Sequence, residues 1–235
     1  MEKEIQEKIL KETEAGYDMI SHKFSQTRNR FWRGLEFIEK YAKRDDNILD
    51  FGCGNGRLAE LFKGKNVNYF GVDTSGKLIE YARENENIRN ELSSIEFVKL
   101  DYNFEKIPFR DNFFGNAYAI AVFHHVPSDE LREKYAKELF RTISEGGYVI
   151  ITVWDLWQPK YRKKVWRKNL DKLLGRSFLD WNDVYITFTD NEGKVFNRYH
   201  HAFTKRYLKK LFKKAGFEIE LIKRIDGNIV LVGRK

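Results

Sequence analysis

The sequence predicts an α/β fold: a mostly parallel, doubly wound sheet with helices on both faces and an antiparallel hairpin at its C-terminal end. Three observations support this prediction. Short apolar, β-branched runs alternate with helical patterns from residue 47 to residue 154. A turn with glycine at every second position follows the first of these runs. Near the C-terminus, Asp226 and Gly227 separate the last two apolar runs, and Asp-Gly favours a two-residue hairpin turn.

Length and composition indicate one domain. A chain of 235 residues with 42% hydrophobic residues can bury a sizeable core, and no linker rich in Pro, Gly or Ser divides it. We expect a single domain over 1–235, with an N-terminal helical cap (1–44) and a basic insertion (about 156–203). The first residues are charged, no apolar run approaches the roughly 20 residues of a membrane span, and Cys53 is the single cysteine. These features predict a cytoplasmic protein that does not associate with a membrane.

The elements follow in order. In the cap we expect a charged helix over 2–15, a polar, irregular segment after it and a second helix over 33–43. The alternating region predicts strands at 48–51, 67–72, 95–100, 114–123 and 147–153, with helices from 58, over 77–86 and over 131–143. The third of these strands is a possible edge of the sheet. The C-terminal part predicts a basic helix at 159–174, extended segments at 183–189 and 194–199, a helix from the capping residue Thr204 to Ala215, closed by Gly216, and the hairpin strands 217–224 and 229–234.

The glycine turn carries the strongest functional indication. It contains Gly52, Gly54 and Gly56, and glycine allows positive φ and close approach of a ligand to the main chain. The third glycine comes one residue too early for the dinucleotide fingerprint G-x-G-x-x-G, which disfavours a nicotinamide dehydrogenase. With Asp50 before it, the turn resembles motif I of the class I S-adenosylmethionine-dependent methyltransferases. The resemblance implies a seven-stranded, Rossmann-like methyltransferase sheet, S-adenosylmethionine as cofactor and no metal.

Acidic residues follow three successive strands at the edge where open α/β sheets bind ligands. Asp50 suits the ammonium of the cofactor, and Gly52 and Gly54 let its amino-acid end pass over the main chain. Asp73, 19 residues beyond Gly54, can accept hydrogen bonds from both ribose hydroxyls. Asp101 fits the exocyclic amine of adenine. The remaining cofactor-binding candidates are Thr74, Tyr102 against the adenine ring and, by the resemblance, Ala121 and Val122 at the methionine end.

Segments outside the turn resemble a narrower family, the tRNA wobble-uridine carboxymethyl methyltransferases. They are residues 17–28 (YDMISHKFSQTR), 119–125 (AIAVFHH), 146–154 and 197–203 (NRYHHAF). Class I methyltransferases usually have Phe-Asp before the fourth strand, whereas this chain has Gly115 and Asn116 there. The resemblance implies esterification of the carboxylate of 5-carboxymethyluridine at tRNA position 34. The resemblance also implies a possible partner, a small zinc-binding activator subunit, which eukaryotic and some archaeal relatives use.

A carboxylate acceptor is ionised at neutral pH, so alignment with the methyl donor matters more than a strong base. The site must hold a desolvated carboxylate, which calls for an arginine or other cationic donors. Arg28 is the first candidate, although it could equally hold the methionine carboxylate of the cofactor. Arg198, His124 and His200 follow as further catalytic candidates, and one of the pair His124 and His125 is expected on the acceptor side.

The net charge of +8 is concentrated in three segments, 19–35, 159–176 and 198–217, which also contain aromatic residues. Lys and Arg beside aromatic rings favour a polyanion with exposed bases, here a tRNA anticodon loop. Two other functions remain open. One is a small-molecule methyltransferase with a carboxylate or quinone-precursor acceptor, and the other is a non-catalytic, RNA-binding subunit of the same fold.

Overall fold

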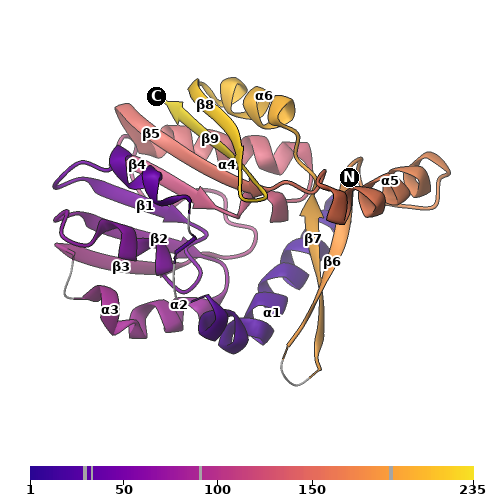
Figure 1. Ribbon diagram of the computed structural model, residues 1–235, viewed down its shortest axis with the longest axis horizontal. Helices are drawn as coiled ribbons and strands as arrows, with labels where there is room; N and C mark the ends of the chain where they lie inside the picture. The colour runs from indigo at the N-terminus through magenta and orange to yellow at the C-terminus, as the bar shows by residue number, and fades with distance from the viewer. Residues whose placement is uncertain (29–30, 33, 90–91, 191–192) are drawn as a thin grey trace.

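The computed structural model describes residues 1–28, 31–32, 34–89, 92–190 and 193–235. In these residues a seven-stranded sheet has the order β3-β2-β1-β4-β5-β9-β8, and β6 and β7 form a separate ribbon (Figure 1). The strands are β1 (Asn47–Phe51), β2 (Asn68–Asp73), β3 (Ser94–Lys99), β4 (Phe114–Ile120), β5 (Ile143–Trp154), β6 (Asp183–Thr189), β7 (Val195–His201), β8 (Glu218–Ile225) and β9 (Asn228–Arg234).

The sheet is parallel from β3 to β5, and β9 runs antiparallel to both of its neighbours, β5 and β8. The predicted sheet with its C-terminal hairpin is therefore confirmed, as is the position of β3 at an edge. Neighbouring residues of β1 point to opposite faces: Ile48 joins one buried cluster and Leu49 the other. Both faces are thus covered, as a doubly wound sheet requires.

Helices supply the two coverings. On one face, α4 (Asp129–Thr142) and α6 (Lys205–Ala215) pack against β5, β8 and β9. On the other lie α2 (Gly76–Glu84), α3 (Glu86–Arg89) and the 3-10 helices η1 (Glu36–Tyr41) and η2 (Arg57–Phe62). The predicted cap of α6 is present, because the Thr204 side chain accepts from the amide of Tyr207 and Gly216 adopts a left-handed conformation.

The N-terminal part differs from the sequence prediction. A single helix, α1 (Lys3–Thr27), runs through the segment expected to be irregular. Gly16 lies in its middle because a Cβ there would come within 2.0 Å of the Phe196 ring on β7. The glycine makes room for a packing contact and does not end the helix. The second expected helix is only the short η1; Arg30 and Arg33, from the first basic segment, lie outside the described residues.

The insertion forms a unit beside the sheet. Its helix α5 (Pro159–Leu173) packs on β6, and α1 contacts β7 on one side and α2 on the other (Figure 1). The helix α1 therefore lies between the sheet and the β6–β7 ribbon. Of the helices in the described residues, none combines the length and the apolar composition needed to cross a bilayer.

Candidate functional site

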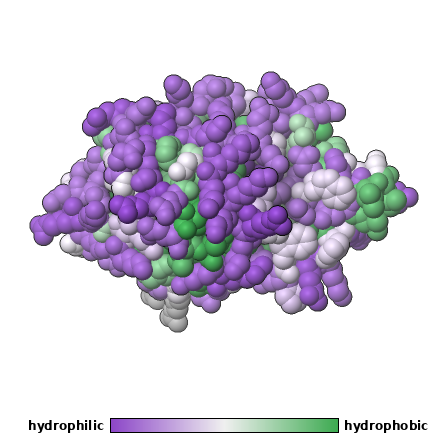
Figure 2. Space-filling view, turned by 90° about the horizontal axis from the view of Figure 1, so that it is seen from above, coloured by the Kyte–Doolittle hydropathy of each residue, from purple (hydrophilic) through white to green (hydrophobic). Residues whose placement is uncertain are grey.

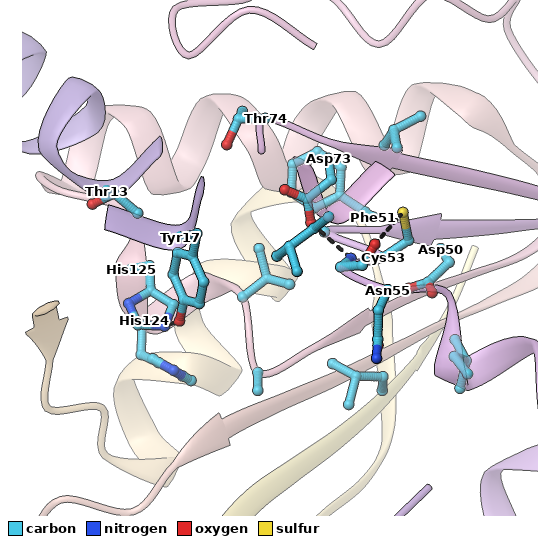
Figure 3. Close-up of a pocket in the computed structure, with 18 of the residues that line it drawn as sticks. Thr13, Tyr17, Asp50, Phe51, Cys53, Asn55, Asp73, Thr74, His124 and His125 are labelled. Atoms are coloured by element: carbon cyan, nitrogen blue, oxygen red, sulfur yellow. Dashed lines mark hydrogen bonds between the residues drawn. The ribbon is translucent and has the colours of Figure 1, made fainter. Parts of the chain in front are cut away.

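A cavity opens at the carboxyl ends of β1, β2 and β4, beneath α1 (Figure 3). Eleven of the thirteen predicted site residues line it: Arg28, Asp50, Gly52, Gly54, Asp73, Thr74, Tyr102, Ala121, Val122, His124 and Arg198. The other two, Asp101 and His200, are not among its lining residues. Asp101 is exposed just after β3, whereas His200 is buried on β7.

The glycine turn is held tightly to the neighbouring strand. The amides of Gly52 and Cys53 donate to the carbonyl of Val72, at 2.8 and 3.0 Å. Gly52 has φ +76°, and a Cβ there would lie 2.4 Å from a methyl carbon of Val122. At Gly54, with φ +55°, the nearest atom to an added Cβ would be 3.6 Å away. Glycine is thus needed at position 52 for close packing, and at position 54 it leaves backbone open to a ligand.

Asp73 links the end of β2 to this turn. Its carboxylate accepts from the amide of Gly54 at 2.8 Å and from the amide of Ser75 at 2.9 Å. Burial raises the pKa of Asp73, while these amide donors act in the opposite direction. Each oxygen keeps a further lone pair, so the carboxylate is fixed in place and can still accept from a ligand hydroxyl.

Asp50 is almost completely buried at the end of β1, with 2% of its surface exposed. The hydroxyl of Tyr69 donates to its carboxylate. Burial raises the pKa of Asp50 to about 7, since the charged form loses its hydration. A cation beside this carboxyl would favour the ionised form and would itself be stabilised by it.

The end of β4 turns sharply at the cavity wall. Ala121 has φ +62°, and its amide donates to the carbonyl and the hydroxyl of Thr152 at 3.0 and 2.9 Å. The left-handed conformation costs a non-glycine residue about 1–2 kcal/mol and is concentrated at functional sites. This turn ends the strand at Ile120, before the expected position 123, and places the side chain of Val122 against Gly52.

Tyr17, to which the sequence analysis assigned no role, pairs with His125, one of the two histidines expected on the acceptor side. The Tyr17 hydroxyl lies 2.8 Å from Nε2 of His125, whose Nδ1 lies 2.8 Å from the carbonyl of Tyr199. Because a carbonyl only accepts, Nδ1 carries the proton and Tyr17 donates to Nε2. Burial lowers the pKa of His125 to about 3, so the ring is neutral. The tyrosine belongs to the segment 17–28 singled out above, which could have pointed to it.

His124 and His200 are also neutral imidazoles. Nδ1 of His124 accepts from the amide of Trp154 at 3.3 Å, and Nδ1 of His200 donates to the carbonyl of Arg198 at 2.9 Å. Burial lowers the pKa of both rings, so neither supplies the positive charge expected of it. Nitrogens of His124, His125 and His200 lie within 4.8 Å of one another, a grouping that could hold a metal ion. The adjacent positive charge of Arg198 opposes cation binding there.

Three arginines give the cavity a cationic side. The guanidinium of Arg198 lies 5.2 Å from the centre of the Trp154 ring, and that of Arg28 lies 4.7 Å from the Phe24 ring. Arg57, which the sequence prediction missed, lies 3.4 Å from the centre of the Trp32 ring, and burial lowers its pKa to about 9. Asp50 and Asp73 line the same cavity. The site can therefore hold a ligand cation and a ligand anion together.

Comparisons with known proteins agree with this arrangement. The family model described as "Methyltransferase domain" matches residues 22–222. The tRNA (carboxymethyluridine(34)-5-O)-methyltransferase of Schizosaccharomyces pombe is 27% identical over 211 residues, which cover 86% of this chain and 87% of the relative. The protein of the same name from Arabidopsis thaliana is 33% identical over 138 residues, covering 59% of this chain. The match spans only 31% of that relative's length.

Solved structures match at lower identity. A SAM-dependent methyltransferase from Methanosarcina mazei has a TM-score of 0.68 and 24% identity, covering 88% of this chain and 98% of its own. The DhpI–SAH complex has a TM-score of 0.69 and 15% identity, covering 96% of both chains. The complex of the Haloferax volcanii Trm112 methyltransferase activator with a methyltransferase has a TM-score of 0.63 and 15% identity, and the match covers 94% of this chain and 96% of the chain in that structure. These likenesses establish the fold.

Proposed function

Because the chain belongs to the family of methyltransferase domains, we propose that it transfers a methyl group from S-adenosylmethionine to the carboxylate of a modified wobble uridine in tRNA. The family match confirms the predicted methyltransferase. S-adenosylmethionine as cofactor agrees with the descriptions of two fold neighbours, a SAM-dependent enzyme and an SAH complex. The tRNA acceptor is supported by the names of the two relatives and by the cationic side of the cavity.

The acidic residues of the cavity fit the cofactor. Asp50 would face its ammonium, Asp73 its ribose hydroxyls, and the open backbone at Gly54 its amino-acid end. Tyr102 lines the cavity and would pack against adenine. Asp101 lies outside that lining, so its contact with the adenine amine stays a prediction. When bound, the cofactor supplies an electrophilic methyl group on a sulfonium.

The observation that carries the acceptor assignment is the convergence of Arg28 and Arg198 on the cavity that also contains Asp50 and Asp73. A carboxylate is already ionised at neutral pH, so no residue has to remove a proton. The arginines would hold its charge, and the enclosing rings would exclude water while the reacting atoms are aligned. Arg28 is assigned to this carboxylate or to that of the cofactor. His124 would contribute a hydrogen bond as a neutral ring. His200, whose Nδ1 donates to the backbone carbonyl of Arg198, would help to hold Arg198 in position.

The test uses tRNA that carries 5-carboxymethyluridine, incubated with the protein and methyl-labelled S-adenosylmethionine. Nucleoside mass spectrometry should find the label in a base-labile ester on that uridine. A base-stable methyl product would contradict the carboxylate acceptor. Label on a free carboxylic acid and none on tRNA would favour a small-molecule methyltransferase. The variant Asp73→Ala is the control, because it should abolish transfer to every acceptor.

A small activator subunit is a further part of the proposal. The Haloferax volcanii complex is a fold neighbour, and β3 offers a sheet edge to which another chain could add. If a zinc-binding activator does not raise the rate at which the isolated chain transfers the methyl group, this subunit is not part of the proposed function.

A further inference from the structure

The helix α5 and the segment after it expose an unusual amount of apolar surface. Of the eight large hydrophobic side chains that are exposed in the described residues, six lie here, with 51–69% of their surface accessible. We call them the α5 surface: Trp166, Leu170, Leu173, Leu174, Phe178 and Trp181. Figure 2 shows hydrophobic residues gathered at the end of the molecule where α5 lies. An apolar patch of this kind marks an interaction site.

A neighbouring side of α5 already has its packing partner. Val165 is fully buried with Leu156, Val184 and Ala202, and this cluster fixes the helix to the β6–β7 ribbon. Trp166, Leu170 and Leu173 follow at intervals of four and three residues, so they share the outward side of the helix. The helix is therefore anchored through one side while its other apolar side is left for a partner.

The charges around the α5 surface select the kind of partner. Arg162 and Lys163 are exposed on the same helix and have no carboxylate partner among the residues that the structure describes, and the exposed Arg167 interacts only at longer range with Asp171. The single acid of α5, Asp171, is paired with Lys168 at 2.9 Å. Unpaired cations interleaved with exposed aromatic rings complement a single-stranded nucleic acid, whose phosphates are anionic and whose bases stack on rings.

The N-terminal end of α5 lies beside the cavity. Trp154 lines the cavity, and its ring is stacked on that of Tyr161, in the first turns of α5, with centroids 6.5 Å apart. The 15 residues of α5 extend about 22 Å from this wall. At about 3.4 Å per stacked nucleotide, that length matches roughly six nucleotides.

We propose that the α5 surface stacks unpaired bases of the RNA whose modified nucleotide enters the cavity. The proposal rests on the tRNA acceptor proposed above, and it adds an aromatic contact to the phosphate contacts that basic segments imply. Trp166 and Phe178 would be the stacking rings, and Arg162, Lys163 and Arg167 would contact the phosphates next to them.

The test measures binding of the full chain to a fluorescein-labelled, unmodified tRNA transcript by fluorescence anisotropy over a series of NaCl concentrations. Trp166→Ala should weaken binding by roughly 5- to 150-fold, the range for loss of one base stack, with an unchanged salt slope. Trp166→Tyr keeps a stacking ring and should restore most of the affinity. Arg167→Ala should instead reduce the salt slope by about one. Since Trp166 is 65% exposed, these variants should keep the wild-type melting temperature.

The outcomes separate this proposal from the proposed function. If Trp166→Ala and Phe178→Ala bind tRNA like wild type, or if wild type binds no tRNA, the stacking surface is refuted. It is also refuted if Trp166→Ala weakens binding to phosphatidylserine vesicles and not to tRNA, because the partner would then be a membrane. Loss of self-association alone would likewise refute it, because the partner would then be a second copy of the chain. A wild-type protein that binds this transcript through Trp166 but transfers no methyl group to tRNA carrying 5-carboxymethyluridine, with a zinc-binding activator present, would refute the proposed function alone.

Discussion

Replacing Asp50 with Asn should remove the pH dependence of S-adenosylhomocysteine binding between pH 5.5 and 7. Burial raises the pKa of Asp50 to about 7, and the ligand ammonium should bind only the ionised carboxylate. The ionised fraction then rises from about 3% at pH 5.5 to about 50% at pH 7. The wild-type affinity should therefore increase about 16-fold over this range, in which an α-amino group stays protonated.

Isothermal titration calorimetry at several pH values measures this change. Methylthioadenosine is the matched ligand, because it keeps the ribose and adenine contacts but lacks the ammonium. Its affinity should be flat with pH in wild type, and so should that of S-adenosylhomocysteine in Asp50→Asn. Equal pH profiles for the two ligands in wild type, or an unchanged 16-fold rise in the variant, would refute a role of Asp50 in binding the ammonium.

Three further predictions concern stability and the acceptor. Because the pKa of Asp50 is raised in the folded state, the folded protein binds a proton that the unfolded chain has already lost. The free energy of unfolding should therefore fall by up to about 4 kcal/mol as the pH rises from about 4 to about 7. In Asp50→Asn the melting temperature should change little with pH over that range. Gly52→Ala should lower the free energy of unfolding by about 2–4 kcal/mol in chemical denaturation, because its Cβ would overlap Val122 and its φ is +76°. Gly64→Ala is the control, with the same φ and no neighbour within 4 Å, and should lower it by only about 1–2 kcal/mol. Equal losses of stability in the two variants would contradict the packing argument. Arg198→Met should lower kcat/KM for tRNA by roughly 10- to 150-fold while the Kd of S-adenosylhomocysteine changes less than about threefold, whereas a parallel loss of both would place Arg198 at the cofactor.

The strand–turn–helix unit at the glycine turn was predictable because its causes are local. Glycine spacing, the apolar run before it and the acid at its start all lie within ten residues. The position of Asp73 beside the turn, where it accepts from the amide of Gly54, also follows from a simple rule, since the carboxyl ends of adjacent parallel strands meet at one edge, although the contact itself was not predicted. The hairpin at Asp226 and Gly227 is a third local case, and all three are present in the structure.

The segment 17–30 shows where local reasoning fails. Polar residues after Gly16 predicted an irregular chain, but α1 continues to Thr27, since Gly16 receives the ring of Phe196 from 180 residues further along the chain. Such a contact leaves no periodic trace in the sequence. The Tyr17–His125 hydrogen bond is likewise made between distant residues.

By itself, the sequence determined the fold class and the methyltransferase family, and it picked out eleven of the residues that line the cavity, because these depend on turn geometry and on strand order. Only the tertiary structure decided the character of the acceptor side. Burial makes His124, His125 and His200 neutral, which leaves the positive charge to Arg28, Arg57 and Arg198. It also showed that Asp101 lies outside the cavity lining and that α5 leaves an aromatic side exposed. Burial and exposure depend on which distant segments pack together, and that information is not contained in any one stretch of the chain.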